Sequence, residues 1–393
     1  MSELKVNSIK GTGASTAAIT IDSSSGGCSA NITNNLTNRN KIINGAMLLA
    51  QRGTSSTSAG YRTTDRFQTG YGNVGQTVTQ SQESLSSSDT GPYEAGFRKY
   101  KRAQLAAAGT ANASGYVEAA SYKAEAQDIA NSGWDSTSSS SKITLSFWFR
   151  CSTNQAFRLN VRSEDGTARM FSTNFTATAN NTWTKITQTI PGNTSPTVDV
   201  DNDNGSGLAI FWIPFYGTDY TDSGSAMDAW KTYSGSSQGT DMASTWLTAG
   251  ASTFDITGVQ LEVGSVATDF EHRTFAQEAL NCKRYYQIIE GNSDLVMFGS
   301  GRASGTSNAL VPVQLAVPLR ASPTISSTNY SGWTASNAET ATAKTPTVVN
   351  FQTTNNQLNL NFPDLAGQLT NARVVTISCN SNSDLVMDAE LPT

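Results

Sequence analysis

The amino-acid sequence predicts a mainly β protein with two sandwich domains, and three observations support this prediction. Only 15% of the residues are charged, whereas Ser, Thr, Asn and Gly are abundant, as expected for strands joined by polar turns. Apolar residues alternate with polar ones at Ile143, Leu145, Phe147 and Phe149, which is the period of a half-buried strand. The 7 Trp, 12 Tyr and 15 Phe argue against a disordered chain, because they supply the apolar surface that a core needs.

Length and charge limit the classes of function. At 393 residues the chain is long enough for two or three domains, each with its own core. The net charge of −5 and the lack of a basic block argue against a nucleic-acid partner. No apolar stretch is long enough to cross a bilayer, and the N-terminal MSELKVNSIKGTG lacks the apolar region of a secretion signal. We therefore expect synthesis in a cytoplasm, no membrane insertion, and reduced thiols at Cys28, Cys151, Cys282 and Cys379.

Residues 41–273 are predicted to form one jelly-roll β-sandwich. In this range Leu208–Phe215 (LAIFWIPF) is almost continuously apolar, which fits a strand covered on both faces. Glu118–Ile129 fits either a strand or a short helix, and its pattern does not decide between them. The preceding residues, 1–40, contain too few apolar side chains for a core of their own.

The segment Phe254–Gln287 predicts a joint between two domains. Its apolar positions change from even to odd numbers at Gly258, which is the pattern of a β-bulge. Thr274 precedes Gln277 by three positions, so a capping box is expected to start a linker helix at 274–291. Apolar residues then follow at the spacing of a short a/d seam, which predicts contact with copies of the chain or with the domain before it: Phe275, Ala279, Cys282, Tyr286 and Ile289.

Residues 292–393 are predicted to form a second β-sandwich. Apolar and polar residues alternate in 311–317 and again in 375–379. The hexapeptide Asn-Ser-Asp-Leu-Val-Met occurs at both 292–297 and 382–387. We expect its two copies to be the first and last strands of this domain, in equivalent surroundings.

Three stretches of the sequence resemble one protein family. They are ITGVQLEVGSVATDFEHR followed by FAQEALNCKRYYQ at the joint, KIINGAMLLAQRGTS with GYRTTDRFQ near Asn40–Arg66, and NTWTKITQTIPGNT at Asn181–Thr194. Their content and order resemble the tail-fibre and tail-appendage proteins of bacteriophages, especially those of marine, podovirus-like phages. The resemblance implies a carbohydrate-binding-like jelly roll, a linker helix and a receptor-binding β domain at 292–393. It also implies a homotrimer that is attached to other virion tail proteins, such as an adaptor or nozzle, through residues 1–40.

His272 is the only histidine of the chain, so a catalytic mechanism that needs this residue type would have to use it. It lies at the domain exit, in the sequence Asp-Phe-Glu-His-Arg, where we expect a hydrogen bond of the joint rather than catalysis.

The loop Asp199–Gly205 alternates carboxylates in the manner of a calcium loop, which makes Asp199, Asp201 and Asp203 candidate Ca²⁺ ligands. Ile210 stands where such a loop would place a bidentate Glu, so an ordinary polar turn is the alternative. No other cofactor is expected.

Aromatic side chains are the best candidates for receptor or sugar binding, because sugars stack on exposed ring faces. Tyr330 and Trp333 lie in a Gly/Ser-rich segment that is predicted to be a turn, although a subunit contact would also explain them. For Trp148 and Trp212 we expect core or interface packing. The other large aromatics of 41–273 that we considered are Trp183, Tyr216, Tyr220, Trp230, Tyr233 and Trp246.

Hydrolysis of a polysaccharide would need two carboxyl groups that converge on one sugar linkage. Loop acids are present, but their spacing does not imply convergence: Glu164, Asp165, Asp219, Asp222, Asp228 and Asp241.

Together, these patterns indicate a short tail fibre of a phage virion that adheres to a bacterial surface glycan or protein and is not an enzyme. Two alternatives stay open. One is a virion fibre or decoration protein, such as a head fibre or connector, without receptor binding. The other is a polysaccharide depolymerase, although the repeat period of a long parallel β-helix is absent from the sequence.

Overall fold

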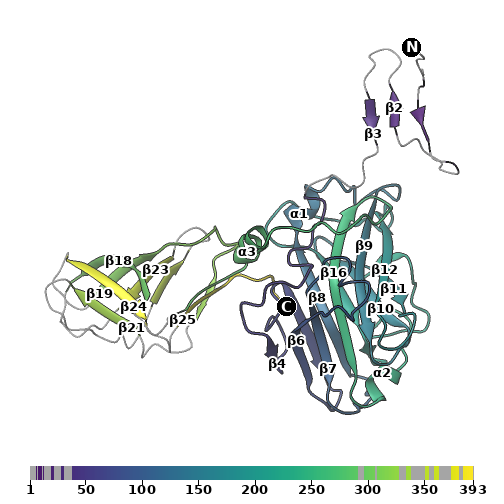
Figure 1. The fold of residues 1–393 in the computed structure, drawn as a ribbon, viewed down its shortest axis with the longest axis horizontal. Coiled ribbons are helices and arrows are strands. Elements are labelled where there is room, and N and C mark those ends of the chain that lie inside the picture. Colours follow the sequence, from purple (N-terminus) through teal and green to yellow (C-terminus); the bar gives the residue numbers. More distant parts are fainter. Residues whose placement is uncertain are drawn as a thin grey trace.

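The computed structural model describes residues 6, 8–10, 12, 19–21, 28–30, 38–290, 296–305, 308–326, 333–337, 350–353, 358–362, 373–379 and 384–392. Antiparallel strands dominate this part of the chain, which confirms the prediction of a mainly β fold (Figure 1). Within it, no helix has the length and apolar content needed to span a lipid bilayer. A small N-terminal sheet consists of β1 (Ser8–Ile9), β2 (Ile19–Ile21) and β3 (Cys28–Ala30).

The first sandwich, as we name strands β4 to β16, consists of two antiparallel sheets packed face to face (Figure 1). One sheet contains β5 (Phe67–Gly72), β8 (Tyr116–Glu125), β13 (Ser206–Ile213), β14 (Phe215–Tyr216), β10 (Phe157–Ser163), β11 (Arg169–Phe175) and β15 (Trp230–Thr232). The other contains β12 (Thr184–Pro191), β9 (Lys142–Cys151), β16 (Thr253–Val263), β7 (Lys99–Leu105), β6 (Val78–Ser84) and β4 (Ser55–Ser56). A short helix, α2 (Thr245–Thr248), precedes β16.

Aromatic rings fill the centre of the first sandwich. Phe147 and Phe149 of β9 meet Phe175 of β11 edge to face, with ring centroids 5.3 and 5.0 Å apart. Trp212 of β13 is 0% exposed and contacts Phe147 at 5.7 Å, so the expected core role of this tryptophan is confirmed. Edge-to-face ring pairs of this kind stabilise a core by about 0.5–1.5 kcal/mol beyond the area that they bury.

The apolar run at Leu208–Phe215 is covered on both faces, as predicted. Leu208, Ile210 and Trp212 belong to the sandwich core, whereas Ala209, Phe211 and Ile213 form a second cluster on the outer face of the sheet. Pro214 separates β13 from β14, and both strands pair with β8 along the same edge. The segment 118–129, for which the sequence allowed either a strand or a short helix, contains both. Strand β8 ends at Glu125, and helix α1 (Ala126–Ala130) follows directly.

The β-bulge predicted at Gly258 is present. The register of β16 against β9 shifts between Thr257 and Gln260, and Gly258 has φ +62°. A Cβ atom at this position would lie 2.6 Å from Cζ of Phe97, so the close approach also requires glycine.

The linker helix begins as predicted and ends earlier than predicted. In α3 (Phe275–Lys283), the Thr274 side chain accepts a hydrogen bond from the Gln277 amide, and the Gln277 side chain accepts one from the Thr274 amide. The helix was expected to continue to residue 291, but a strand, β17 (Tyr286–Glu290), starts three residues after its end. Pairing of β17 with a distant strand, β25 (Asp384–Asp388), overrides the local helical pattern.

The predicted a/d seam is therefore wrong as a helical stripe. Phe275, Ala279 and Cys282 lie in α3, but Tyr286 and Ile289 lie in β17. The Phe275 side chain is 64% exposed, whereas Cys282 is buried with a free thiol. The five residues do not share one helix face, and the trimer stays a prediction.

The C-terminal domain, as we name strands β17 to β25, contains two further sheets. The larger one runs in the order β21 (Trp333–Asn337), β24 (Val374–Cys379), β18 (Val296–Ser304), β19 (Asn308–Val313), β23 (Leu358–Phe362) and β22 (Asn350–Thr353). The smaller one consists of β17, β25 and β20 (Thr324–Ser326). Val311 and Ile377 of the larger sheet share a core with Leu385 and Met387 of the smaller one.

The two copies of the repeated hexapeptide do not have equivalent surroundings, which corrects that prediction. Residues 296–297 of the first copy begin β18 in the larger sheet. Residues 384–387 of the second copy lie in β25 of the smaller sheet.

The end of the C-terminal domain returns to the first sandwich (Figure 1). Glu390 forms an ion pair with Arg66, Asp388 lies 3.2 Å from Nη2 of Arg52, and Lys123 Nζ donates to the carbonyl of Pro392 at 2.6 Å. The C-terminal domain thus contacts the first sandwich both where the chain enters it, at Tyr286, and where the chain leaves it, after Asp388.

We predict that Gly258→Ala destabilises the first sandwich by about 2–4 kcal/mol, because a positive φ and a clash with Phe97 both act against the new methyl group. Gly133→Ala is the matched control, since Gly133 has φ +88° but no atom within 4 Å of the added Cβ. Urea unfolding of both variants measures the difference. Equal destabilisation of the two would show that the bulge contact is unimportant.

Candidate functional site

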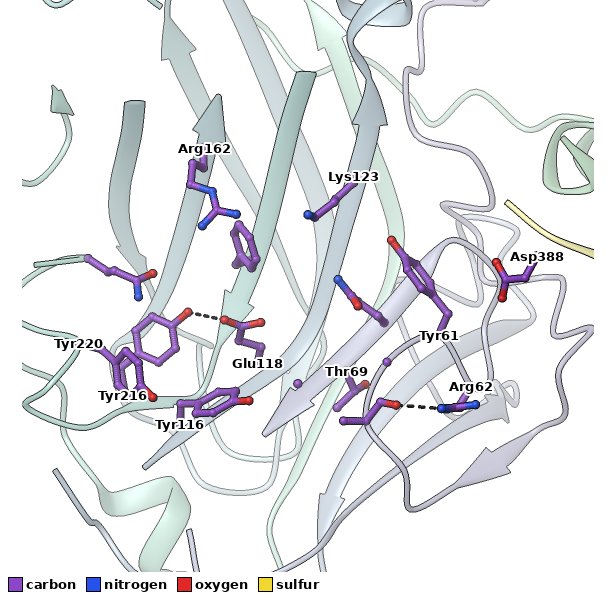
Figure 2. Close-up of a pocket in the computed structure, with 16 residues that line it drawn as sticks. Tyr61, Arg62, Thr69, Tyr116, Glu118, Lys123, Arg162, Tyr216, Tyr220 and Asp388 are labelled. Atoms are coloured by element: carbon purple, nitrogen blue, oxygen red, sulfur yellow. Dashed lines mark hydrogen bonds between the residues drawn. The ribbon is translucent and has the colours of Figure 1, made fainter. Parts of the chain in front are cut away.

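A groove of about 830 Å³ lies on the outer face of the β5–β8–β13–β10 sheet (Figure 2). The strands are brought together in register here: Val117 of β8 lies opposite Phe215 of β14 on one side and Tyr71 of β5 on the other. Tyr116 and Glu118, the neighbours of Val117 in β8, both line the groove. The volume is within the range of pockets that bind small molecules.

Three tyrosines form one end of the groove (Figure 2). Tyr220 packs against Tyr116 with ring centroids 5.7 Å apart and against Tyr216 at 5.3 Å. Tyr116 and Tyr220 are partly exposed, whereas Tyr216 is buried and belongs to the outer apolar cluster with Phe211. The exposed ring surface of Tyr116 and Tyr220 is available to a ligand.

Glu118 lies beside the tyrosines and is held by a short hydrogen bond. The Tyr216 hydroxyl donates to Oε1 of Glu118 at 2.5 Å. Burial raises the pKa of Glu118 above its ordinary value, although the hydrogen bond from Tyr216 and the charges of Arg162 and Lys123 oppose this change. Burial also raises the pKa of Tyr216, so its hydroxyl remains a donor at neutral pH.

Two cations lie along the opposite wall and share one carboxylate. Glu164 accepts from Nε of Arg162 at 2.9 Å and from Nζ of Lys123 at 3.1 Å. Burial alone would raise the pKa of Glu164, but Arg162 and Lys123 hold it below the ordinary value. The Arg162 guanidinium also lies over Phe211, 5.1 Å from the ring centroid. These contacts hold two cationic side chains, Arg162 and Lys123, in the wall of the groove.

The far rim of the groove comes from two domains. Tyr61 and Arg62 belong to the loop between β4 and β5, and Asp388 ends β25 of the C-terminal domain (Figure 2). Arg62 is exposed, and its Nε donates to the carbonyl of Ala59 at 3.2 Å. A ligand in the groove can therefore contact ring faces at one end and charged or polar groups at the other.

Two residues, Tyr330 and Trp333, were predicted for receptor binding. Tyr330 lies outside the described residues. Trp333 was expected in a turn, but it begins β21 and pairs with Cys379 of β24. This backbone pairing across the sheet replaces the predicted turn.

The predicted calcium site is not formed. Among the described residues, which include Asp199, Asp201 and Asp203, no group of three or more His, Cys, Asp or Glu side chains is arranged to hold a metal ion. Asp203 instead accepts a hydrogen bond from the Gly205 amide at 2.7 Å, and the Asp201 amide donates to Asp165 at 2.9 Å. The Asp203 carboxylate and the Asp201 amide are thus used in the hydrogen bonds of a polar turn.

His272 takes part in the joint, as predicted. Its Nε2 lies 2.9 Å from the carbonyl oxygen of Ala95, and its ring packs against Phe97 and Phe270. It therefore connects the domain exit to the loop before β7.

Sequence reasoning missed most of the groove. Tyr216 and Tyr220 were among the aromatics considered, but Glu118, Arg162 and Arg62 were not identified as site residues. A usable signal was the alternation of Tyr116 and Glu118 with Val117 and Ala119, which predicts a polar-aromatic strand face.

Comparisons with known proteins give structural similarities of low sequence identity. No protein-family model matches the chain, and no curated protein matches it. The enzymatically active domain of tailspike protein 4 of bacteriophage CBA120 is 10% identical, with a TM-score of 0.29 over 57% of this chain and 22% of that chain. A family 11 carbohydrate-binding module from Clostridium thermocellum is 11% identical, with a TM-score of 0.26 over 55% of this chain and 98% of that chain.

A third similar structure is the tandem CBM22-1-CBM22-2 domain of Xyn10C from Paenibacillus barcinonensis. It is 8% identical, with a TM-score of 0.25 over 82% of this chain and 92% of that chain. The chain thus spans about a fifth of the tailspike structure and most of the carbohydrate-binding structures that it resembles. At these identities and TM-scores, the similarities do not assign a function.

We predict that Tyr216→Phe raises the pKa of Glu118 further, because it removes the hydrogen bond that stabilises the ionised carboxylate. Tyr220→Phe is the control, since the Tyr220 hydroxyl donates to the carbonyl of Ser114 instead. A ¹³C NMR titration of the Glu118 carboxyl carbon, assigned with Glu118→Gln, measures both variants. An unchanged pKa in Tyr216→Phe would contradict the assignment of this hydrogen bond.

Proposed function

We propose that this protein is a non-catalytic adhesive component of a phage virion, a short tail fibre, that binds a bacterial surface glycan in the groove of its first sandwich. The observation that carries this proposal is the cluster of Tyr116, Tyr216 and Tyr220 beside Glu118 in an open groove. The adhesive role rests on this groove, and the virion role rests on the sequence resemblance at the joint.

The groove suits a sugar ring better than a purely apolar ligand. A sugar offers an apolar C–H face that packs on aromatic rings and hydroxyls that need both donors and acceptors. Tyr116 and Tyr220 supply ring surface, while Glu118, Arg162 and Lys123 supply fixed hydrogen-bonding groups. Because Glu164 partly neutralises both cations, the groove does not require a strongly acidic ligand.

Binding without turnover is the reading that the carboxyl groups favour. Glu118 and Asp388 are the carboxylic acids that line the groove. Figure 2 shows Asp388 well apart from Glu118, beyond Tyr61. Hydrolysis needs two carboxyl groups on either side of one linkage, and the described groove does not offer such a pair.

We predict that Tyr220→Ala weakens glycan binding about tenfold through loss of ring stacking. The probes are a neutral β-glucan, a neutral dextran and an anionic alginate, with affinity electrophoresis and calorimetry as the measurements. Tyr93→Ala is the control, because Tyr93 is partly exposed but packs on Arg98, outside the groove. A wild-type protein that binds none of the three probes would contradict glycan binding and favour the alternative of a virion fibre or decoration protein without receptor binding.

The homotrimer is part of the same proposal. Phe275 is 64% exposed and Leu280 is 49% exposed on α3, which leaves apolar surface at the joint for contact with other copies. Native mass spectrometry is expected to give three times the 41.6 kDa chain mass, and Phe275→Ser is expected to shift the population toward single chains. A wild-type protein that is entirely monomeric would exclude the trimer.

A further inference from the structure

A second cavity, of about 940 Å³, lies between the first sandwich and the C-terminal domain. One wall comes from the segment that contains Arg52 and β4, and the other from the small sheet of β17, β25 and β20. The Arg52 guanidinium stacks on Tyr286 of β17, 3.7 Å from the ring centroid. Nothing in the proposed function assigns a role to this cavity.

The cavity meets the groove at a shared wall. Tyr61, Arg62 and Asp388 line both of them. Two of these residues come from the loop between β4 and β5, and the third comes from β25. An extended ligand that starts at the tyrosine end of the groove therefore passes over these three residues to reach the second cavity.

Three polar atoms at this junction are buried without a hydrogen-bond partner. They are the hydroxyl of Tyr61, Nη1 of Arg52 and Oε1 of Glu390, and all three residues line the second cavity. Nη1 of Arg52 lies 3.4 Å from Oε1 of Glu390 and 3.7 Å from Oδ1 of Asp65, so Arg52 and Glu390 are paired by charge. Of the three atoms, the Tyr61 hydroxyl is the one without such a pair. Buried polar atoms without partners are costly and rare, and they point to a missing group that completes their hydrogen bonds.

The chemistry of the Tyr61 hydroxyl indicates the kind of group that is missing. This hydroxyl can donate or accept a hydrogen bond. A ligand hydroxyl also does both, so it can complete the bond in either direction. A metal ion is not favoured, since no ligand cluster for one exists among the described residues.

We propose that the groove and the interdomain cavity form one continuous site, in which a single polysaccharide chain is held by both domains. One of its hydroxyl groups completes the hydrogen bond of Tyr61 after a small turn of that side chain, beside Arg62 and Asp388 of the shared wall. This inference rests on the proposed glycan binding and deepens it. The ligand is a long chain rather than a terminal sugar, and β25 of the C-terminal domain contributes to binding.

The test blocks the cavity and leaves the groove intact. Ser326 lies exposed in β20 and lines only the second cavity, so Ser326→Trp fills that space. Asn308→Trp is the matched control, because Asn308 is exposed on β19 of the same domain and lines neither cavity. The ligands are whichever of the β-glucan, dextran and alginate probes binds most tightly, and the tetrasaccharide prepared from it. Equal melting temperatures of the full-length variants confirm that they are folded.

We expect Ser326→Trp to weaken binding of the polysaccharide about tenfold and to leave the tetrasaccharide unaffected, while Asn308→Trp binds both like the wild type. Tyr61→Phe is expected to weaken the polysaccharide about fivefold, through the loss of one hydrogen bond. If Ser326→Trp and Tyr61→Phe bind the polysaccharide like the wild type, while Tyr220→Ala still weakens it, the continuous site is wrong and the groove alone binds glycan. If Tyr220→Ala also has no effect, the proposed function fails as well.

Discussion

The Arg66 guanidinium lies where four parts of the chain meet, and the arrangement of the two domains depends on it. It is 0% exposed, lies 3.4 Å above the ring of Tyr285, donates to the carbonyl of Lys123 at 2.6 Å and pairs with Glu390. Removing a cation from water costs several kcal/mol unless partners replace the lost hydration. The partners here come from β8, from the end of α3 and from the segment after β25, so the cost of burial is offset only when all of them are in place.

The residues that bind the buried Arg66 also connect the joint between the domains to the groove. Lys123, whose carbonyl binds Arg66, also extends its ammonium to Glu164 and to the last residues of the chain. Glu125, two residues further along β8, holds Arg284 at the end of α3 through two hydrogen bonds of 2.7 Å. Strand β8 thus carries Tyr116 and Glu118 at one end and the domain interface at the other.

The sequence predicted the features that depend on local chemistry. The bulge at Gly258, the capping box at Thr274 and the doubly covered strand at Leu208 each follow from a few neighbouring residues. The features that it missed depend on pairing between distant segments. Tyr286 continues a helical pattern but pairs with Asp388, and Trp333 looks like a turn residue but pairs with Cys379. The groove was missed for the same reason, since Glu118, Arg162 and Arg62 come from separate strands and loops whose register no short motif records.

The adjacency of β17 and β25 has a consequence for how such a protein can diversify. The chain enters the C-terminal domain at Tyr286 and leaves it at Asp388, and these two residues are direct cross-strand partners. A domain whose entry and exit points are neighbours behaves as an insertion, because the distance that its ends must span does not depend on its contents. Recombination at these two positions could therefore replace the entire intervening sequence while keeping Arg66, Tyr285 and Glu390. Under this topology, the same first sandwich can carry a variety of C-terminal domains.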